Sequence, residues 1–180
     1  MRWQSWWYLL SFGLTLMFSS FIRLQAETVT LTSSADTSLF ETSPDANMGG
    51  NSTVAAGTTY QDMRSRALYR FSFAEKIPTN ATILSVKLTL YVTLAPAGGV
   101  NSFFELHRML KDWNEGNKTG SRGQTATTGQ VTWNAQSFPN VLWDAPGAAS
   151  GTDFSAPVSA VSEKVRSGSL QFQFNPAAGG

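Results

Sequence analysis

One short stretch of the chain combines an aromatic ring with carboxylate and amide groups. It is the run DWNEG at residues 112–116, which opens the longest polar segment of the sequence. Aromatic rings can stack on the apolar faces of pyranoses while nearby polar groups bind the hydroxyls. We therefore predict carbohydrate contacts at Trp113 and Glu115, and at Trp133 and Trp143 further along. The alternative is that these tryptophans fill a core, as rings next to strands often do.

Two arginines extend this prediction to acidic sugars. Arg66 and Arg70 stand four residues apart in a segment with strand alternation, so both point to the same side of the strand. The guanidinium fork matches the geometry of a carboxylate. We predict that Arg66 and Arg70 contact a polysaccharide that contains uronate groups. The alternative is that they form the solvated side of their strand.

Oxygen ligands near turns indicate a second kind of site. Asp36, Asp45, Asn47 and Asp112 all lie beside residues that favour turns, and Ca²⁺ takes about six to eight oxygen ligands. We predict that these four residues contribute to a structural calcium site, although their spacing is not that of an EF-hand. The alternative is that Asp36 and Asp45 cap turns through their own backbone.

The residue types that catalysis requires are sparse. His107 is the single histidine, the chain has no cysteine, and neither G-x-S-x-G nor H-E-x-x-H occurs. Asp112 and Glu115 offer a carboxylate pair, but two residues three apart around a loop need not face one glycosidic bond. We predict that the protein is not an enzyme. A polysaccharide lyase or hydrolase is the less favoured alternative.

Alternation of apolar and polar residues predicts the strands that must position these side chains. The clearest run is 84–92, where every second residue is Leu or Val. A second run at 67–73 alternates Ala, Tyr and Phe with Leu, Arg and Ser. Residues 76–81 between them contain the Pro and Asn of a turn. We predict that the two runs form a hairpin.

Shorter strand patterns recur along the rest of the chain, and no convincing helical period interrupts them. They lie at 28–32, 35–41, 54–57, 103–110, 131–133 and 170–174. Residues 154–165 fit either a strand or a short helix. Many short strands with long turns are typical of a sandwich. We therefore predict an all-β fold, a β-sandwich of antiparallel strands in a single domain over residues 27–180.

The beginning of the sequence predicts export. Arg2 precedes an apolar run at 6–22 that closes on Leu-Gln-Ala at 24–26, the pattern of a signal peptide over residues 1–26. The alternative, a retained membrane anchor, is disfavoured because Ser, Gly and Thr interrupt the apolar run. We predict a secreted or cell-surface protein with no membrane contact after cleavage.

The net charge of the exported part does not imply an electrostatic partner. Of the 13 Lys and Arg residues, Arg2 and Arg23 lie before the cleavage point, which leaves 11 against 12 Asp and Glu and a net charge of −1. The basic side chains are scattered rather than clustered. We therefore predict no nucleic-acid partner.

Four motifs, taken in order, resemble one family. They are ADTSLFETSPDANMGGNSTVAAG at 35–57, RALYRFSF followed by IPTNATILSVKLTLYV, RMLKDWNEG at 108–116, and VTWN at 131–134. This order is similar to that of the DNRLRE domain, also classed as carbohydrate-binding module family 96. The resemblance implies a jelly-roll-type β-sandwich in an exported or cell-surface protein of bacteria or archaea. Some members bind acidic polysaccharides such as alginate.

The sequence departs from the family pattern in two respects. Ser72 stands where many relatives have an Asp, and relatives continue with further strands after a segment like residues 170–180. The resemblance therefore implies a sandwich that lacks its last strands and leaves an open sheet edge. We predict a non-catalytic carbohydrate-binding module whose partner is a polysaccharide. The alternative is a structural cell-surface or extracellular-matrix subunit that assembles with other protein chains by β-strand pairing.

Overall fold

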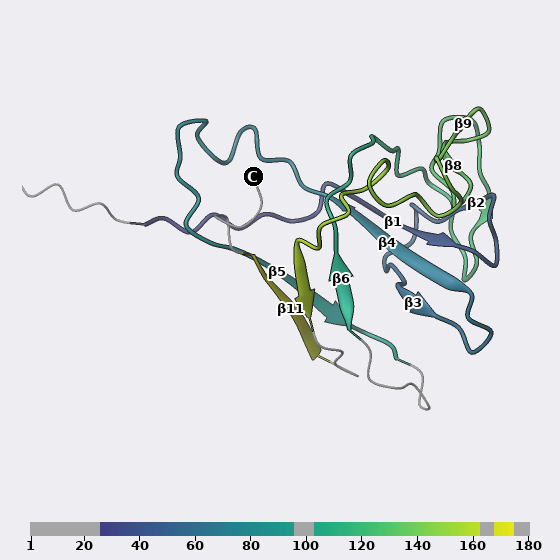
Figure 1. Ribbon diagram of the computed structural model, residues 1–180, viewed down its shortest axis with the longest axis horizontal. Coiled ribbons are helices and arrows are strands. Elements are labelled where there is room, and N and C mark those ends of the chain that lie inside the picture. Colours follow the sequence, from purple (N-terminus) through teal and green to yellow (C-terminus); the bar gives the residue numbers. More distant parts are fainter. Residues whose placement is uncertain (1–25, 96–102, 163–167, 175–180) are drawn as a thin grey trace, which may run out of the picture.

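The structure is all-β in the part of the chain that it describes. The computed structural model describes residues 26–95, 103–162 and 168–174 (Figure 1). Every regular element there is a strand, and every pairing between these strands is antiparallel, which confirms the predicted class. No helix in the described ranges has the length and apolar character to cross a membrane. The predicted signal peptide at 1–26, apart from Ala26, lies outside the described residues.

One half of the fold is built on a central strand. Strand β4 (Arg64–Arg70) pairs along one edge with β1 (Ala35–Phe40) and along the other with β3 (Gly57–Thr58). Two short ribbons lie beside this sheet (Figure 1). They are β2 (Ala46–Asn47) with β7 (Gln124–Thr125), and β8 (Ala135–Ser137) with β9 (Val141–Leu142).

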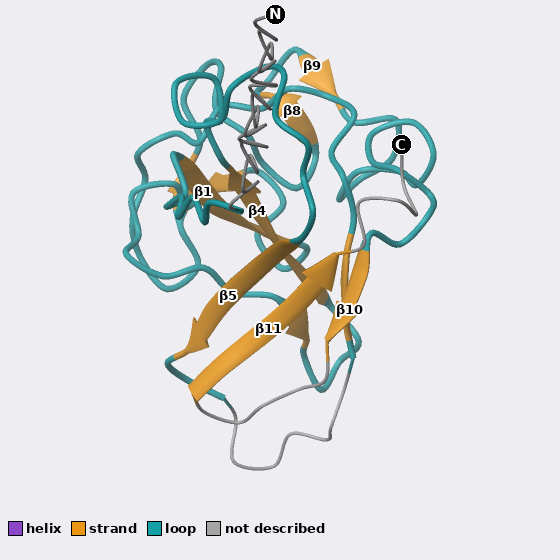
Figure 2. Cartoon of the chain, turned by 90° about the vertical axis from the view of Figure 1, so that its left-hand side faces the viewer, coloured by secondary structure: helices purple, strands orange, loops and turns teal. Residues whose placement is uncertain are grey.

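The other half consists of two ribbons. Strand β5 (Val86–Val92) pairs with β11 (Gly168–Phe174) over their whole lengths, from Val86 opposite Phe174 to Val92 opposite Gly168. Strand β6 (Phe104–Leu106) pairs with β10 (Ala160–Ser162). Figure 2 shows β11 between β5 and β10, with β5 at the margin of the molecule.

The predicted hairpin between residues 67–73 and 84–92 is wrong. Strands β4 and β5 both exist, but they belong to different sheets. One edge of β4 pairs with β1 from Ser65 to Arg70, and the other pairs with β3 only at Arg64 and Ser65. Strand β5 instead pairs with β11. The apolar side chains of the two strands then lie side by side on one face of the ribbon, with Leu88 opposite Phe172 and Leu90 opposite Leu170. Matching apolar faces decided the pairing, and proximity in sequence did not.

Other predicted strands succeed or fail according to whether a partner strand exists. The predictions at 35–41 and 170–174 agree with β1 and β11, whereas 28–32 and 131–133 have no strand. Val131 is fully buried, as a core strand residue would be, but its N–H donates to the carbonyl of Asn114 in a neighbouring loop. At 54–57, the N–H of Ala55 donates to the hydroxyl of Ser38, so strand β3 begins only at Gly57.

Apolar side chains gather in two clusters that correspond to the two halves. The tryptophan cluster contains Leu39, Leu68, Trp113, Val131, Trp133, Trp143 and Ala148. The ribbon cluster contains Ala160, Leu170 and Phe172, with Leu88, Leu90, Val92, Phe104, Leu106 and Phe174 packed against them. The apolar side of the β5–β11 ribbon thus faces the β6–β10 ribbon. A jelly-roll arrangement of these sheets stays a prediction.

A buried hydroxyl without a partner lies in β1. Thr37 is 1% exposed, and its Oγ1 has no hydrogen-bond partner. By strand alternation its side chain lies on the same side of β1 as Leu39, a member of the tryptophan cluster. An unpaired buried hydroxyl costs about 1 to 3 kcal/mol relative to an apolar group of the same shape.

We expect Thr37→Val to raise the free energy of unfolding by about 1 kcal/mol, because Val keeps the shape and removes the unpaired hydroxyl. Urea denaturation followed by circular dichroism measures the change. The matched control is Ser38→Ala, since Ser38 is equally buried but accepts a 2.7 Å hydrogen bond from Ala55. That control should destabilise the fold. Equal losses in both variants would contradict the assignment of Thr37.

Candidate functional site

The three tryptophans predicted to stack on sugars are core residues in this structure. Trp113, Trp133 and Trp143 are 6%, 5% and 4% exposed. The ring N–H of Trp143 is also occupied, since it donates to the carbonyl of Thr132 at 2.9 Å. A ring that stacks on a sugar needs an exposed face, and none of these three rings has one. The alternative reading of the sequence, that they fill a core, describes their placement.

Arg70 packs on the outer side of this core. Its guanidinium carbon lies 4.7 Å from the centroid of the Trp113 ring, and its Nη2 donates to the carbonyl oxygen of Trp113. The same nitrogen is 4.0 Å from the carboxylate of Asp112, which is fully exposed. A cation over an indole ring is attracted by the negative face of that ring. Arg70 is therefore fixed in orientation while 42% of its side chain still meets solvent.

Arg66 is held more completely. Its guanidinium lies over the rings of Trp133, at 5.6 Å, and Phe154, at 5.3 Å. Its Nη1 donates to the carbonyl oxygens of Gly147 and, at 2.7 Å, Ala148. Burial lowers the pKa of Arg66, and the nearby charge of Arg64 lowers it further. Because its Nη1 already donates to two carbonyls of the chain and its side chain is only partly exposed, Arg66 offers a uronate less free surface than Arg70 does.

The arginine face of β4 is in contact with the core, which neither reading of the sequence anticipated. Arg66 and Arg70 do share one side of the strand with Leu68, but this side covers the tryptophan cluster. Arg70 remains partly open to solvent, at 42% of its side chain, and lines a pocket, whereas Nη1 of Arg66 is bound to the chain. The two arginines cover the tryptophan rings with their flat guanidinium groups and satisfy carbonyls that the nearby loops leave open.

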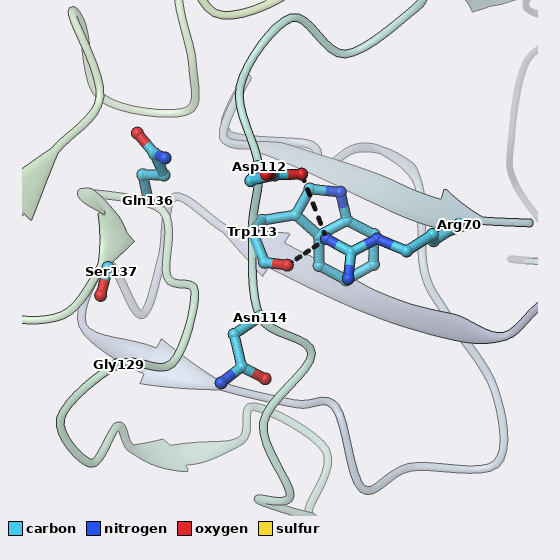
Figure 3. Close-up of a pocket in the computed structure, with 7 residues that line it drawn as sticks. All are labelled: Arg70, Asp112, Trp113, Asn114, Gly129, Gln136 and Ser137. Carbon is cyan, nitrogen blue, oxygen red and sulfur yellow. Dashed lines mark hydrogen bonds and ion pairs between the residues drawn. The ribbon is translucent and has the colours of Figure 1, made fainter. Parts of the chain in front are cut away.

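Beside Arg70 lies an open pocket with a volume of about 370 Å³ (Figure 3). Three separate segments line it: the end of β4, residues 112–114, and the stretch from Gly129 to strand β8. The lining residues are Arg70, Asp112, Trp113, Asn114, Gly129, Gln136 and Ser137. Figure 3 shows the side chains of Asn114 and Gln136 on different sides of the opening. The pocket thus has a polar rim around the backbone of Trp113.

The predicted calcium ligands are engaged in separate interactions. The carboxylate of Asp36 accepts a hydrogen bond from Ser33 at 3.0 Å, and that of Asp45 accepts one from Asn134 at 3.0 Å. Asp112 faces Arg70. Within the described ranges, no three His, Cys, Asp or Glu residues lie close enough together to hold a metal ion. Calcium binding stays a prediction without support from this arrangement.

Asn47, the fourth predicted ligand, uses its whole side chain for hydrogen bonds within the protein. It is 0% exposed. Its Nδ2 donates to the carbonyls of Glu115, at 2.7 Å, and Val131, at 3.0 Å. Its Oδ1 accepts from the N–H groups of Gly49 and Lys118, both at 3.2 Å. One side chain therefore joins three loops, and its oxygen is already shared by two donors.

Glu115, a predicted sugar contact, also has an internal role. Its Oε1 accepts a 2.7 Å hydrogen bond from the backbone N–H of Asp36 at the start of β1. Glu115 does not line the pocket, whereas Asp112 does. The two carboxylates of the DWNEG run therefore have different surroundings. They do not form a pair around one cavity.

Two pocket residues and one buried carboxylate elsewhere had no signal in the sequence. Gln136 and Ser137 reach the pocket only because β8 folds back beside residues 112–114. Asp153 is 1% exposed, and its Oδ2 accepts hydrogen bonds from the N–H groups of Asp144, at 2.9 Å, and Ala149, at 2.7 Å. An isolated Asp in a loop of Gly, Ala and Ser is not distinguishable by sequence from a solvated one.

His107 lies apart from the pocket. Its Nδ1 is 2.9 Å from the carbonyl oxygen of Ser155, its Nε2 is 3.4 Å from the carboxylate of Glu105, and its ring meets Phe154 edge-on. These contacts join the end of β6 to Phe154 and Ser155, and Phe154 packs against the tryptophan cluster. The side chain thus has a structural environment, as expected for a lone histidine, although His107 lies just after β6 and not in a strand.

Comparisons with known proteins do not add to this description. No protein-family model, curated protein or solved structure matches the chain. The resemblance to the DNRLRE domain therefore stays a prediction from the motifs.

We expect Asn47→Ala to lower the free energy of unfolding by about 3 kcal/mol or more, because it leaves buried backbone groups without partners. Thermal unfolding by calorimetry measures the loss. Asn51→Ala is the matched control, since Asn51 makes two 3.0 Å hydrogen bonds with Gly120 nearer the surface. It should cost about 1 kcal/mol. An Asn47 variant no less stable than the Asn51 variant would refute the role given to Asn47.

The raised pKa of Tyr69 predicts how the free energy of unfolding responds to alkaline pH. Burial raises the pKa of Tyr69 from 10.0 to about 12, and the carboxylate of Asp36 contributes. The neutral phenol is thus favoured in the folded state, and this stabilisation is complete below pH 10 and is lost as pH rises through about 12. We expect Tyr69→Phe to remove that part of the pH dependence, measured as urea midpoints across this range. Tyr60→Phe, at an exposed position, should leave it unchanged, and identical profiles for all three proteins would be the contrary result.

Proposed function

We propose that the protein is a non-catalytic carbohydrate-binding module that takes a segment of polysaccharide at the pocket beside Arg70. The observation that carries this proposal is the composition of the rim. Arg70, Asp112, Asn114, Gln136 and Ser137 bring donors and acceptors from three segments to one open surface. Sugars present many hydroxyl groups at short intervals, so a binding site for them needs such convergent polar groups.

Each side chain of the rim fits a part of a sugar. The amides of Asn114 and Gln136 can donate to one hydroxyl and accept from another, and the hydroxyl of Ser137 can do both. Arg70 supplies a fixed positive charge for a carboxylate group, because its stacking on Trp113 orients the guanidinium before any ligand arrives. Asp112, 4.0 Å away, competes for that charge. An acidic polymer would displace the Asp112 carboxylate from Arg70.

The same rim gives little support for catalysis. Glycoside hydrolysis generally uses two carboxyl groups on either side of the scissile bond. Among the residues that the structure describes, the pocket is lined by one carboxylate and by no histidine, lysine or cysteine. A binding role therefore suits the pocket better than hydrolysis or a lyase reaction.

The wider context of the proposal comes from the sequence. The signal-peptide pattern at residues 1–26 supports a secreted or cell-surface location. The ordered motifs that resemble the DNRLRE domain support a jelly-roll sandwich with a polysaccharide ligand. The open form of the pocket suits a polymer, because a closed cavity would admit only a chain end.

We expect the purified protein to bind at least one polymer among alginate, pectin and neutral glucans in affinity gel electrophoresis. Asn114→Ala and Gln136→Ala should each weaken binding about 10-fold, the effect of losing roughly one hydrogen bond of 1.4 kcal/mol. Arg70→Gln should weaken binding to alginate more than binding to a neutral glucan, since it removes the positive charge.

Gln61→Ala is the matched control, because it truncates an exposed amide in the turn between β3 and β4. It should bind like the unaltered protein. Circular dichroism of every variant checks that the fold is retained. Absence of binding to all polymers at millimolar sugar would refute the proposal, and equal effects of the Gln61 and Gln136 changes would remove the pocket from it.

A further inference from the structure

Strand β5 has a free edge. It pairs with β11 along one side, and no other strand of the described residues pairs with it. In Figure 2 this second side of β5 forms the outer margin of the ribbon. Its outward N–H and C=O groups therefore have no ladder partner in the part of the chain that is described. Free edges are templates for pairing with another strand.

The chain on both sides of this edge lacks the features that usually block such pairing. Residues 82–95 contain no proline and no glycine, and their only charged side chain is Lys87. They also expose apolar surface at both ends, since Leu84 is 69% and Leu94 89% exposed. Native edges are normally protected by several charges, a proline or a bulge. This one has a single lysine.

The sequence of the edge is self-complementary about Thr89. Read outward in both directions, Leu88 mirrors Leu90, Lys87 mirrors Tyr91, Val86 mirrors Val92, Ser85 mirrors Thr93, and Leu84 mirrors Leu94. Antiparallel pairing of two copies about a two-fold axis at Thr89 would place these mirrored residues opposite each other. Apolar residues would meet apolar residues, hydroxyls would meet hydroxyls, and no two like charges would be opposed.

We propose that two copies of this chain associate through their β5 edges, antiparallel and centred on Thr89. Directly opposed residues in an antiparallel pair point to the same side of the sheet. The apolar side of β5, which covers the ribbon cluster, would thus continue into that of the second copy. The exposed side chain of Leu84 in each copy would be covered by Leu94 of the other. The result is one sheet with the order β11, β5, β5, β11.

The proposed partner is a second copy of the chain rather than another protein, because the sequence of the β5 edge is complementary to itself in antiparallel pairing. A strand that serves a different partner has no reason to be symmetric about one residue. Here four of the five mirrored pairs about Thr89 match in character, and the fifth sets Lys87 opposite Tyr91. Lys87 opposite Tyr91 is the one pair with a charge, and it occurs twice in the dimer by symmetry.

The proposal can be tested by measuring the mass of the protein in solution for variants of the Lys87–Tyr91 pair. The unaltered chain should sediment as a dimer at about 100 μM, a concentration that reveals even weak self-association. Tyr91→Lys should shift the mass to that of a monomer, because it places two lysines opposite each other at both ends of the interface. The double variant Lys87→Glu with Tyr91→Lys should restore the dimer.

A fold check and a control variant distinguish loss of the interface from loss of the fold. Tyr91 is 77% exposed, so its replacement leaves the monomer fold intact, which circular dichroism verifies. Tyr60→Lys, a change of the same kind at an exposed position away from β5, should remain dimeric. A monomeric unaltered chain, a dimeric Tyr91→Lys variant, or a double variant that stays monomeric would each overturn the proposal.

A cysteine placed on the axis tests the register independently. The chain has no cysteine, so Thr89→Cys introduces one thiol per copy. Opposed Cα atoms in an antiparallel pair lie about 4.5 to 5.5 Å apart, within the range of a disulfide. Mild oxidation should therefore cross-link the Thr89→Cys variant. Gln171→Cys, opposite Thr89 on β11, would be about 14 Å from its copy across three strand spacings and should not cross-link; the reverse result would exclude this register.

Discussion

The amide of Asn47 is the interaction on which the rest of the loop-rich half depends. Its four hydrogen bonds join the turn after β2 to residues 115–118 and to Val131. The space around it is so close that Gly116 and Gly123, both with positive φ, have no room for a Cβ atom. Loops with few apolar residues lack a core of their own, so a buried and fully satisfied amide gives them a defined geometry. The hydrogen bonds of Asn47 also help to position the pocket, because the lining residues 112–114 come just before residues 115–118, which Asn47 binds.

Arginine has an unusual share in this core. Arg66 and Arg70 lie on the side of β4 that faces the tryptophans, where an all-apolar strand would carry Leu or Val. Their planar guanidinium groups cover the rings and bind loop carbonyls that would otherwise lack partners. Arg70 extends this arrangement to the surface. A core contact and the charge of the pocket are thus provided by one residue, so the pocket is tied directly to the core beneath it.

The sequence predicted the elements whose signal is local. Strands β5 and β11 alternate strongly, and the structure contains both. The pairing of β4 with β5 failed because strand pairing depends on which faces match across the whole chain. Trp113, Trp133 and Trp143 were misplaced because an aromatic residue beside a polar loop looks the same whether it faces solvent or a core. Gln136 and Ser137 were not found at all, since only the return of β8 toward residues 112–114 makes them part of a site.

The separation of aromatic residue types between the two clusters has a spectroscopic consequence. Within the described residues, all three tryptophans belong to the tryptophan cluster, whereas the aromatic residues of the ribbon cluster are phenylalanines. Once the predicted signal peptide, with Trp3, Trp6 and Trp7, is removed, indole emission therefore reports on one half of the fold and not on the other. Far-ultraviolet ellipticity, by contrast, includes the long β5–β11 ribbon. Coincidence of the two signals during denaturation would mean that the halves unfold as one cooperative unit, and divergence would show that each half has its own stability.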